Sequence, residues 1–371
     1  MNPNDRTLAR KKRARFPVVV TLIVVLIWML LLSGFVPSFQ QQGTPPFRDA
    51  EGQIRPGSIA EERTITLGGW DQYVLIRGEN SAAPLLVFLH GGPGTPETGL
   101  IRRYNAELEQ HFVVVLWEQR GAGRSYSRDL DPETLTLAQL LSDLDELVDS
   151  LLAEFDKSQV LLVGHSFGTE LGIAYASAHP SKVAGYIGVC QETDVPRSEA
   201  EGYEWALEQA RERNDRRAVR RLEAIGPPPY PMASTRVQRK YVWKYGGAFH
   251  GGQSMASVVL ASLGAQEIGV RDLLLYSQGQ KASLDVMWPQ IVLHNANERY
   301  PAVDVPVWFF LGRHDHHVSA TLAEEYFERL EAPTKEVVWF EESAHNPPYE
   351  EPARFNAEVI RVGQDLFPGL Q

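Results

Sequence analysis

The chain has 371 residues, of which 43% are hydrophobic and 22% charged, with a net charge of −11 and a single cysteine. One cysteine, Cys190, excludes an intramolecular disulfide. Residues 1–15 contribute +5 through six basic residues and one acidic residue, which leaves −16 on the rest of the chain and argues against a nucleic acid partner.

The first 36 residues are typical of a membrane anchor. Basic residues gather in 1–15, and 18–36 follow without a charge, which is about the length that a bilayer-spanning helix needs. We therefore predict a cytoplasmic basic tail over 1–15 and a transmembrane signal-anchor helix over 16–36. The positive flank would keep the tail cytoplasmic and place the rest of this single-pass chain on the extracytoplasmic side of the cell membrane. A cleaved signal peptide is the alternative, although Leu32-Ser33-Gly34 is a poor cleavage site.

Residues 37–57 are rich in Gln, Gly and Pro without periodicity, which predicts a linker. Beyond it, apolar runs predict strands that alternate with helices. The expected strands cover 63–67, 73–77, 85–90, 112–117, 159–164, 183–189, 305–311 and 336–340. We expect an α/β protein with a mostly parallel eight-stranded sheet, helices on both faces and a core formed by 58–191 and 302–371.

Gly164-His165-Ser166-Phe167-Gly168 joins an apolar strand to a segment with helical spacing. A serine between two glycines on a sharp strand-to-helix turn forms a nucleophile elbow, because the flanking positions lack room for a Cβ atom. The pentapeptide predicts that Ser166 is a nucleophile.

Two later segments supply an acid and a base in the order that such an elbow requires. Asp315 follows the carboxyl end of the strand at 305–311, and His345 lies on the loop after the last strand. A serine hydroxyl is too weakly acidic to attack a carbonyl unaided, so a neutral His345 would accept its proton and Asp315 would hold the tautomer. We predict Ser166, Asp315 and His345 as a catalytic triad.

Acyl transfer also needs backbone N–H groups that bind the oxyanion. One normally comes from the residue after the nucleophile, here Phe167, and the other from the loop after the third strand. That loop is His90-Gly91-Gly92-Pro93-Gly94, and we predict Gly92 as its donor.

Other polar residues near these motifs have structural interpretations. Cys190 is expected to be a buried thiol, and His90 and His165 are expected to be satisfied packing residues. Glu118 and Arg120 are expected to support the loop after the strand at 112–117 through an ion pair. The run His314-Asp315-His316-His317 could suggest a metal site, but contiguous loop residues seldom present three ligands to one ion. We expect no metal and no cofactor.

The chain resembles α/β-hydrolases of the proline iminopeptidase (prolyl aminopeptidase) type over about residues 60–366. The resemblance rests on 90–94, on Glu118-Gln119-Arg120-Gly121-Ala122-Gly123-Arg124-Ser125 and on the elbow. It implies an α/β-hydrolase fold and the removal of N-terminal residues from short peptides. Three departures from the family pattern bear on the substrate class: Glu118 replaces an aspartate, His165 and Phe167 flank the serine instead of Gly and Trp, and Thr95-Pro96 replace glycines.

Residues 192–301 break the alternation of strands and helices, which predicts an inserted helical cap that shapes the pocket. The resemblance implies that acidic residues of the cap hold the free amino terminus of a substrate. The candidates are Glu192, Asp194, Glu199, Glu201, Glu204, Glu208, Glu212 and Glu223. Glu204, with the adjacent Trp205, is our predicted substrate-binding position, and most of the others are expected on solvated helix faces.

These features predict a membrane-anchored serine hydrolase that acts through an acyl-enzyme on a short peptide or another small molecule. A carboxylesterase, amidase or lactonase is the alternative among enzymes, because the same triad serves all acyl transfers. Ser166 argues against a haloalkane dehalogenase or an epoxide hydrolase, which use a carboxylate nucleophile. A tethered binding protein without turnover is the alternative of another class, and the oligomeric state is not set by the sequence.

Overall fold

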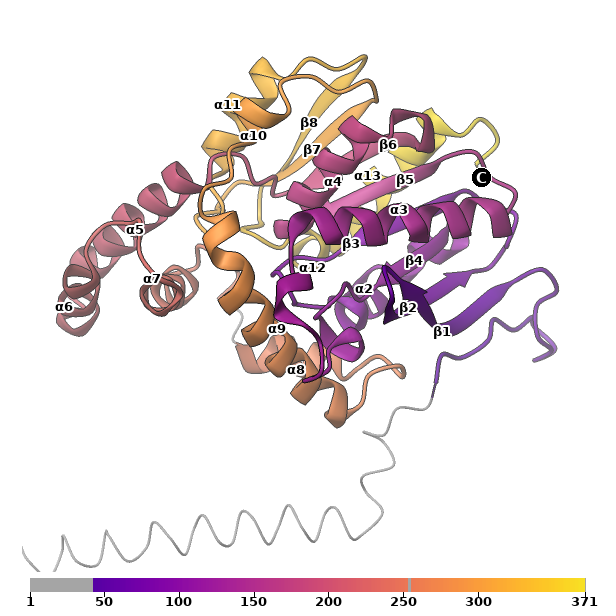
Figure 1. Cartoon of the computed structure of the whole chain (residues 1–371), viewed down its shortest axis with the longest axis horizontal. Helices are drawn as coiled ribbons and strands as arrows, with labels where there is room; N and C mark the ends of the chain where they lie inside the picture. The colour runs from indigo at the N-terminus through magenta and orange to yellow at the C-terminus, as the bar shows by residue number, and fades with distance from the viewer. Residues whose placement is uncertain (1–42, 253–254, 371) are drawn as a thin grey trace, which may run out of the picture.

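The computed structural model describes residues 43–252 and 255–370 (Figure 1). Its centre is an eight-stranded sheet in the order β1-β2-β4-β3-β5-β6-β7-β8. β2 pairs antiparallel with β1 and β4, and all other neighbours are parallel. The strands are β1 Ile59–Leu67, β2 Trp70–Gly78, β3 Leu85–Leu89, β4 Val113–Trp117, β5 Val160–His165, β6 Val183–Val189, β7 Val307–Gly312 and β8 Lys335–Phe340. The eight predicted strands and the mostly parallel sheet are confirmed.

Helices cover both faces of the sheet. On one face, α3 (Leu137–Glu154), α4 (Phe167–Ala178) and α11 (Ala320–Arg329) bury side chains such as Leu144 and Tyr326 in one apolar cluster. On the other face, α2 (Thr98–Tyr104) and α13 (Pro352–Leu366) pack residues such as Ile101 and Val359 in a second cluster. The short α12 (Pro347–Glu350) precedes α13. Alternate residues of each central strand point into the two clusters, as the pleat requires.

The loop after β4 is held by two separate buried networks rather than by the predicted ion pair. Arg120 forms a two-pronged contact with Asp143 of α3, with Nε 2.7 Å from Oδ2 and Nη2 2.9 Å from Oδ1. Glu118 instead accepts hydrogen bonds from the Arg124 backbone N–H, at 2.7 Å, and from the Tyr276 hydroxyl, at 2.9 Å. The prediction of a Glu118–Arg120 pair is therefore wrong, because each side chain finds a partner on a distant element.

Six helices lie between β6 and β7 in the part of this segment that the structure describes, where the sequence predicts a cap. They are α5 Val195–Glu212, α6 Arg216–Ile225, α7 Met232–Lys244, α8 Met255–Ser262, α9 Val270–Ile291 and α10 Ala296–Arg299. α5, α6 and α7 enclose a small apolar cluster of their own, which includes Ala206, Leu222 and Val242. The domain boundaries derived from the sequence stay predictions.

The described chain begins in the predicted linker, which is held in place from Thr44 onward. The guanidinium of Arg77 on β2 donates to the Thr44 hydroxyl and to the Pro45 carbonyl, and it lies 4.5 Å from the centre of the Phe47 ring. In 43–252 and 255–370, no helix has the length and apolarity that crossing a bilayer requires. The predicted anchor over 16–36 lies outside these residues.

Candidate active site

Ser166 stands on the turn between β5 and α4 with φ +54° and ψ −126°. Few non-glycine residues adopt such a positive φ, and this strain is typical of a nucleophile elbow. The flanking glycines are required by their surroundings. A Cβ at Gly164 would lie 2.5 Å from the Gly168 carbonyl oxygen, and one at Gly168 would lie 2.1 Å from the Leu89 carbonyl oxygen. β5, α4 and the end of β3 are thus packed too closely for any side chain there.

The structure brings the three predicted triad residues into one hydrogen-bonded chain. Ser166 Oγ lies 2.9 Å from His345 Nε2, and His345 Nδ1 lies 2.8 Å from Asp315 Oδ2. The other carboxylate oxygen of Asp315 accepts from the backbone N–H groups of His317, at 2.8 Å, and Val318, at 2.9 Å. The three residues follow β5, β7 and β8 and so meet at the carboxyl edge of the sheet.

Burial lowers the pKa of His345, while the adjacent Asp315 carboxylate raises it by less. The imidazole is therefore neutral at pH 7, the form that can accept a proton from Ser166.

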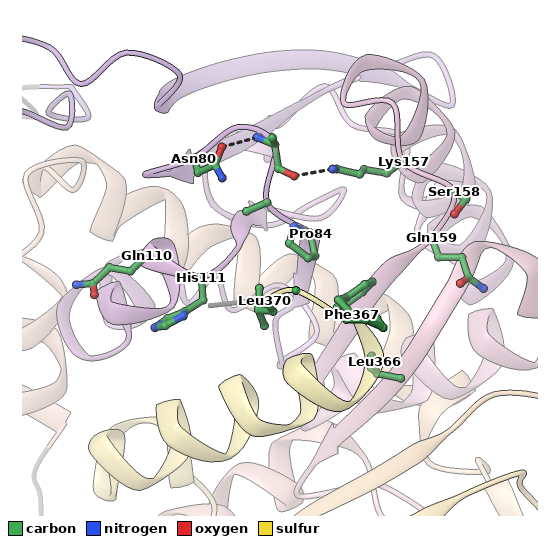
Figure 2. A pocket seen from close by; sticks show the side chains of 14 residues that line it. Asn80, Pro84, Gln110, His111, Lys157, Ser158, Gln159, Leu366, Phe367 and Leu370 are labelled. Carbon is green, nitrogen blue, oxygen red and sulfur yellow. Dashed lines mark hydrogen bonds between the residues drawn. The ribbon is translucent and has the colours of Figure 1, made fainter.

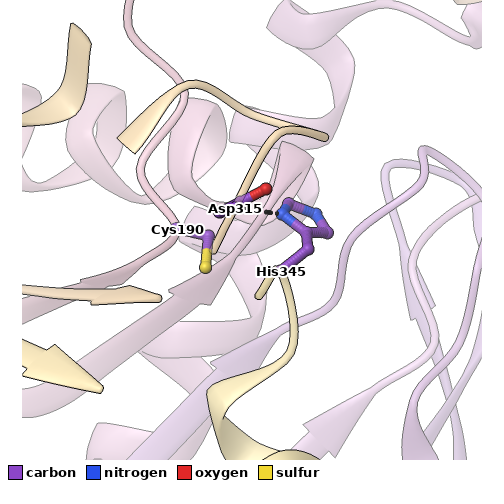
Figure 3. Close-up of side chains that lie close together, drawn as sticks. All are labelled: Cys190, Asp315 and His345. Carbon is purple, nitrogen blue, oxygen red and sulfur yellow. Dashed lines mark hydrogen bonds and ion pairs between the residues drawn. The ribbon is translucent and has the colours of Figure 1, made fainter. Parts of the chain in front are cut away.

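Cys190 lies beside Asp315 and His345 (Figure 3), and the ligand atoms of the three residues all lie within 4.8 Å of one another. Burial raises the pKa of the Cys190 thiol well above its ordinary value. Metal binding needs the thiolate, which this environment disfavours, and the Asp315 and His345 atoms already bond each other. The cysteine is buried, as predicted.

The predicted backbone donors border Ser166. Phe167 begins α4, so its N–H has no acceptor within the helix. The loop after β3 lies against the nucleophile, since a Cβ at Gly91 would be 3.0 Å from the Ser166 Cβ. Gly92 is exposed with φ +122°. His90 secures the start of this loop, because its ring contacts the Gly91 carbonyl at 2.8 Å and accepts from the Gln119 N–H at 3.1 Å.

A cavity of about 620 Å³ opens over Ser166 and His345. The loop after β3 forms one wall, and α7 and α9 form another through residues such as Trp243, Leu284 and Trp288. A second hollow, of about 660 Å³, lies at the opposite ends of the strands, lined by Asn80, Lys157 and the C-terminal residues 366–370 (Figure 2). None of the predicted site residues lines that hollow, so the cavity at Ser166 is the candidate site.

Glu97 is a buried carboxylate on the cavity wall that the sequence did not single out. Its Oε1 lies 2.7 Å from Nδ1 of His165, and the His165 Nε2 lies 2.8 Å from the backbone oxygen of His345. Burial lowers the pKa of His165, but the Glu97 carboxylate and the His345 carbonyl outweigh this and the pKa is raised. The pair thus supports the backbone of the candidate base. His165 is a satisfied packing residue, as predicted, but its partner is 68 positions away in sequence and gave no signal.

Glu192 also lines the cavity and is 8% exposed. Burial and the nearby Glu170 carboxylate raise its pKa to about 7, against the opposing charge of Arg239. It stands in a buried polar group in which Arg239 pairs with Glu199 and His294 Nδ1 lies 2.8 Å from Glu170 Oε1. A carboxyl group in a cleft whose pKa is raised to about 7 is a candidate binding group.

The structure gives the predicted binding role of Glu204 and Trp205 no support. Glu204 is exposed on α5, and the Trp205 ring stacks on His316 with 4.1 Å between ring centres. Neither residue lines the cavity. Glu192, three positions after the end of β6, does. That position at the carboxyl edge of the sheet was the signal that could have favoured Glu192 over Glu204.

Comparison with known proteins is consistent with this geometry. The family model described as "Alpha/beta hydrolase family" matches residues 86–358. The chain is 33% identical over 306 residues to "Probable aminopeptidase YbaC" of Bacillus subtilis (strain 168), covering 82% of this chain and 96% of that protein. It is 41% identical over 101 residues to "Probable proline iminopeptidase" of Streptomyces coelicolor, which covers 26% of this chain and 29% of that protein. The crystal structure of a proline iminopeptidase-related protein from Thermus thermophilus superposes with a TM-score of 0.63 at 22% identity, over 84% of this chain and 99% of that one.

Proposed function

The chain belongs to the alpha/beta hydrolase family, and we propose that it is a serine aminopeptidase of the proline iminopeptidase type. The observation that carries the proposal is the hydrogen-bonded chain from Ser166 through His345 to Asp315, which opens into a cavity with two buried carboxylates on its wall. The aminopeptidase and iminopeptidase names of the relatives support the same substrate class.

The proposed reaction has two steps. Ser166 Oγ attacks the carbonyl carbon of the first peptide bond while His345 Nε2 takes its proton, and the Phe167 and Gly92 N–H groups stabilise the oxyanion. The C–N bond breaks, His345 returns the proton to the leaving amine, and an acyl-enzyme remains on Ser166. Water, deprotonated by His345, then hydrolyses this ester and releases the N-terminal residue. Asp315 holds the His345 tautomer throughout.

In this proposal, Glu192 binds the amino terminus of the substrate. Glu192 lines the cavity, and an entering ammonium group would favour the ionised form of its carboxyl, because an opposite charge lowers the pKa of a carboxyl. Glu97, which lines the same cavity, is already engaged by His165 through Oε1. Hydrolysis of an ester does not require the Glu192 carboxylate, so the free amine is the feature that separates the two candidate activities.

We also propose that residues 16–36 anchor the enzyme in the membrane with the catalytic domain on the extracytoplasmic side. The support is the uncharged run at 18–36 and its basic flank. Cell fractionation tests this: the full-length chain should need detergent for release, and release by high salt alone would contradict a spanning helix.

The test of function is kcat/KM of the full chain on L-prolyl anilide, on its N-blocked counterpart and on a short acyl ester. Ser166→Ala is the inactive control, and Ser158→Ala, which changes an exposed serine, is the matched control. We expect the wild type and Ser158→Ala to prefer the free-amine anilide. Ser166→Ala should lose hydrolysis of this substrate. Preference for the ester with indifference to the amine would make the protein an esterase. No Ser166-dependent turnover of any of the three would favour a binding protein.

A further inference from the structure

We infer that one face of α8 and α9 rests on the surface of the bilayer in which the chain is anchored. The face, called here the α8–α9 face, is formed by Val259, Leu260, Val270 and Leu274, with exposed fractions of 37%, 65%, 52% and 61%. Only two other large apolar side chains are comparably exposed in the described residues, Ile54 and Leu293. The four lie within 16 residues of one another in sequence, at the end of α8 and in the first turns of α9, and a group of exposed apolar side chains is typical of an interaction surface.

The charges around this face suit anionic lipid headgroups. Arg271 follows Val270 directly, Arg103 lies beside Gly264 between α8 and α9, and both arginines are exposed. The acidic residues in 257–278 are Glu267 and Asp272, which are 0% and 4% exposed. Glu267 pairs with Arg102, and Asp272 lies 3.3 Å from Arg124. On a chain of net charge −11, the exposed part of this segment thus carries no negative charge. Apolar side chains with a basic border are typical of interfacial contact with membranes.

The path of the chain brings this face to the membrane. The Thr44 hydroxyl donates to Glu267 Oε1 at 2.8 Å, on the loop between α8 and α9. Figure 1 shows the described chain beginning near this loop, at the same edge of the molecule as α8. The proposed anchor ends at 36, and an extended chain advances at most about 3.5 Å per residue. Residue 43 therefore lies within about 25 Å of the end of the anchor. This step rests on the anchor proposed above and not on the peptidase activity.

The same helix carries the face and a wall of the cavity. Val270 and Leu274 lie in the first turns of α9, and Gln280, Leu284 and Trp288 line the cavity farther along it. At 1.5 Å per residue, Gln280 lies about 15 Å along the axis from Val270. Contact of the α8–α9 face with lipid would hold the active site close to the membrane and fix its orientation.

The test places a fluorophore at single sites of the full chain in vesicles of phosphatidylcholine and phosphatidylglycerol. Leu260→Cys and Leu274→Cys probe the face. Leu293→Cys is the matched control, an equally exposed leucine beyond the other end of α9. The native Cys190 is buried, and the unsubstituted chain carried through the same labelling gives the background. The measurements are flotation with the vesicles, the emission wavelength, and quenching by spin-labelled lipid.

We expect the chain to float and the labels at 260 and 274 to be blue-shifted and quenched several times more strongly than the label at 293. Equal quenching at all three sites would overturn the inference. Blue-shifted labels that lipid does not quench would mean that a second protein copy covers the face instead. A chain that does not float would overturn the anchor and this inference together, whereas hydrolysis of prolyl anilide in the same samples reports separately on the proposed peptidase.

Discussion

Glu192→Gln should separate recognition of the amino terminus from the acyl-transfer chemistry. The substitution keeps the shape of the side chain and removes the charge of a residue that lines the cavity. A hydrogen bond to a charged group contributes about 2 kcal/mol, so kcat/KM on the free-amine anilide should fall roughly 30-fold. Hydrolysis of a short acyl ester should stay unchanged, because Ser166, His345 and Asp315 are untouched.

The pH profile gives the same experiment a second readout. Burial and Glu170 raise the pKa of Glu192 to about 7, so its carboxylate is ionised only above that pH. In the wild type, kcat/KM on the anilide should rise through pH 7 and fall above about 8, where the α-amino group loses its charge. Burial lowers the pKa of His345, so the base is already neutral where Glu192 titrates. In Glu192→Gln, the rise in kcat/KM around pH 7 should therefore be absent.

Glu204→Gln is the matched control, because it makes the same change on the exposed face of α5. It should leave kcat/KM on both substrates and the pH profile unchanged. Stability adds a further check. The folded pKa of Glu192 is raised, so the folded wild type loses stability as pH rises toward 7, and Glu192→Gln should be more stable at pH 8. Equal losses in the two variants, or a loss on the ester in Glu192→Gln, would refute Glu192 as the amine-binding group.

Three further predictions concern the triad and its support. Asp315→Asn should lower kcat about 10⁴-fold in steady-state assays while the far-UV spectrum stays native, because the base loses its tautomer; a loss below about tenfold would contradict the role. Gly168→Ala should abolish activity and lower Tm, since its Cβ would lie 2.1 Å from the Leu89 carbonyl oxygen; an active, equally stable variant would contradict the packing. Arg120→Met should cost about 3–5 kcal/mol in urea unfolding, because Asp143, 0% exposed, loses its ion-pair partner. A cost below about 1 kcal/mol would show that water or another group compensates for the lost partner.

The sheet and the meeting of Ser166, His345 and Asp315 could be predicted because their signals are local. Most central strands are apolar runs, and Ser166, Asp315 and His345 each follow a parallel strand, so the topology brings them to one edge. The observed strand β1 begins at Ile59 rather than at the predicted 63, because Glu61 and Glu62 interrupt the apolar signal at its start. Pairing with β2 along its whole length extends the strand beyond the hydrophobic signal.

The roles of the buried polar residues could not be predicted in this way, because they depend on distant contacts. Glu97 contacts His165 in the elbow, and Arg120 pairs with Asp143 on α3. Glu204 and Glu192 are the same residue type within one predicted cap, and only the fold shows that one faces solvent and the other the cavity. Glu192 lies between β6 and α5, where no helical periodicity indicates the direction of a side chain.

Covalent labelling of the full chain with an aryl fluorophosphonate tests most directly whether Ser166 is the activated nucleophile. Intact mass and peptide mapping should show a single adduct on Ser166 in the wild type, none in Ser166→Ala, and much slower labelling in His345→Ala. Labelling at another residue, or equal rates in the wild type and His345→Ala, would contradict a serine nucleophile activated by this triad.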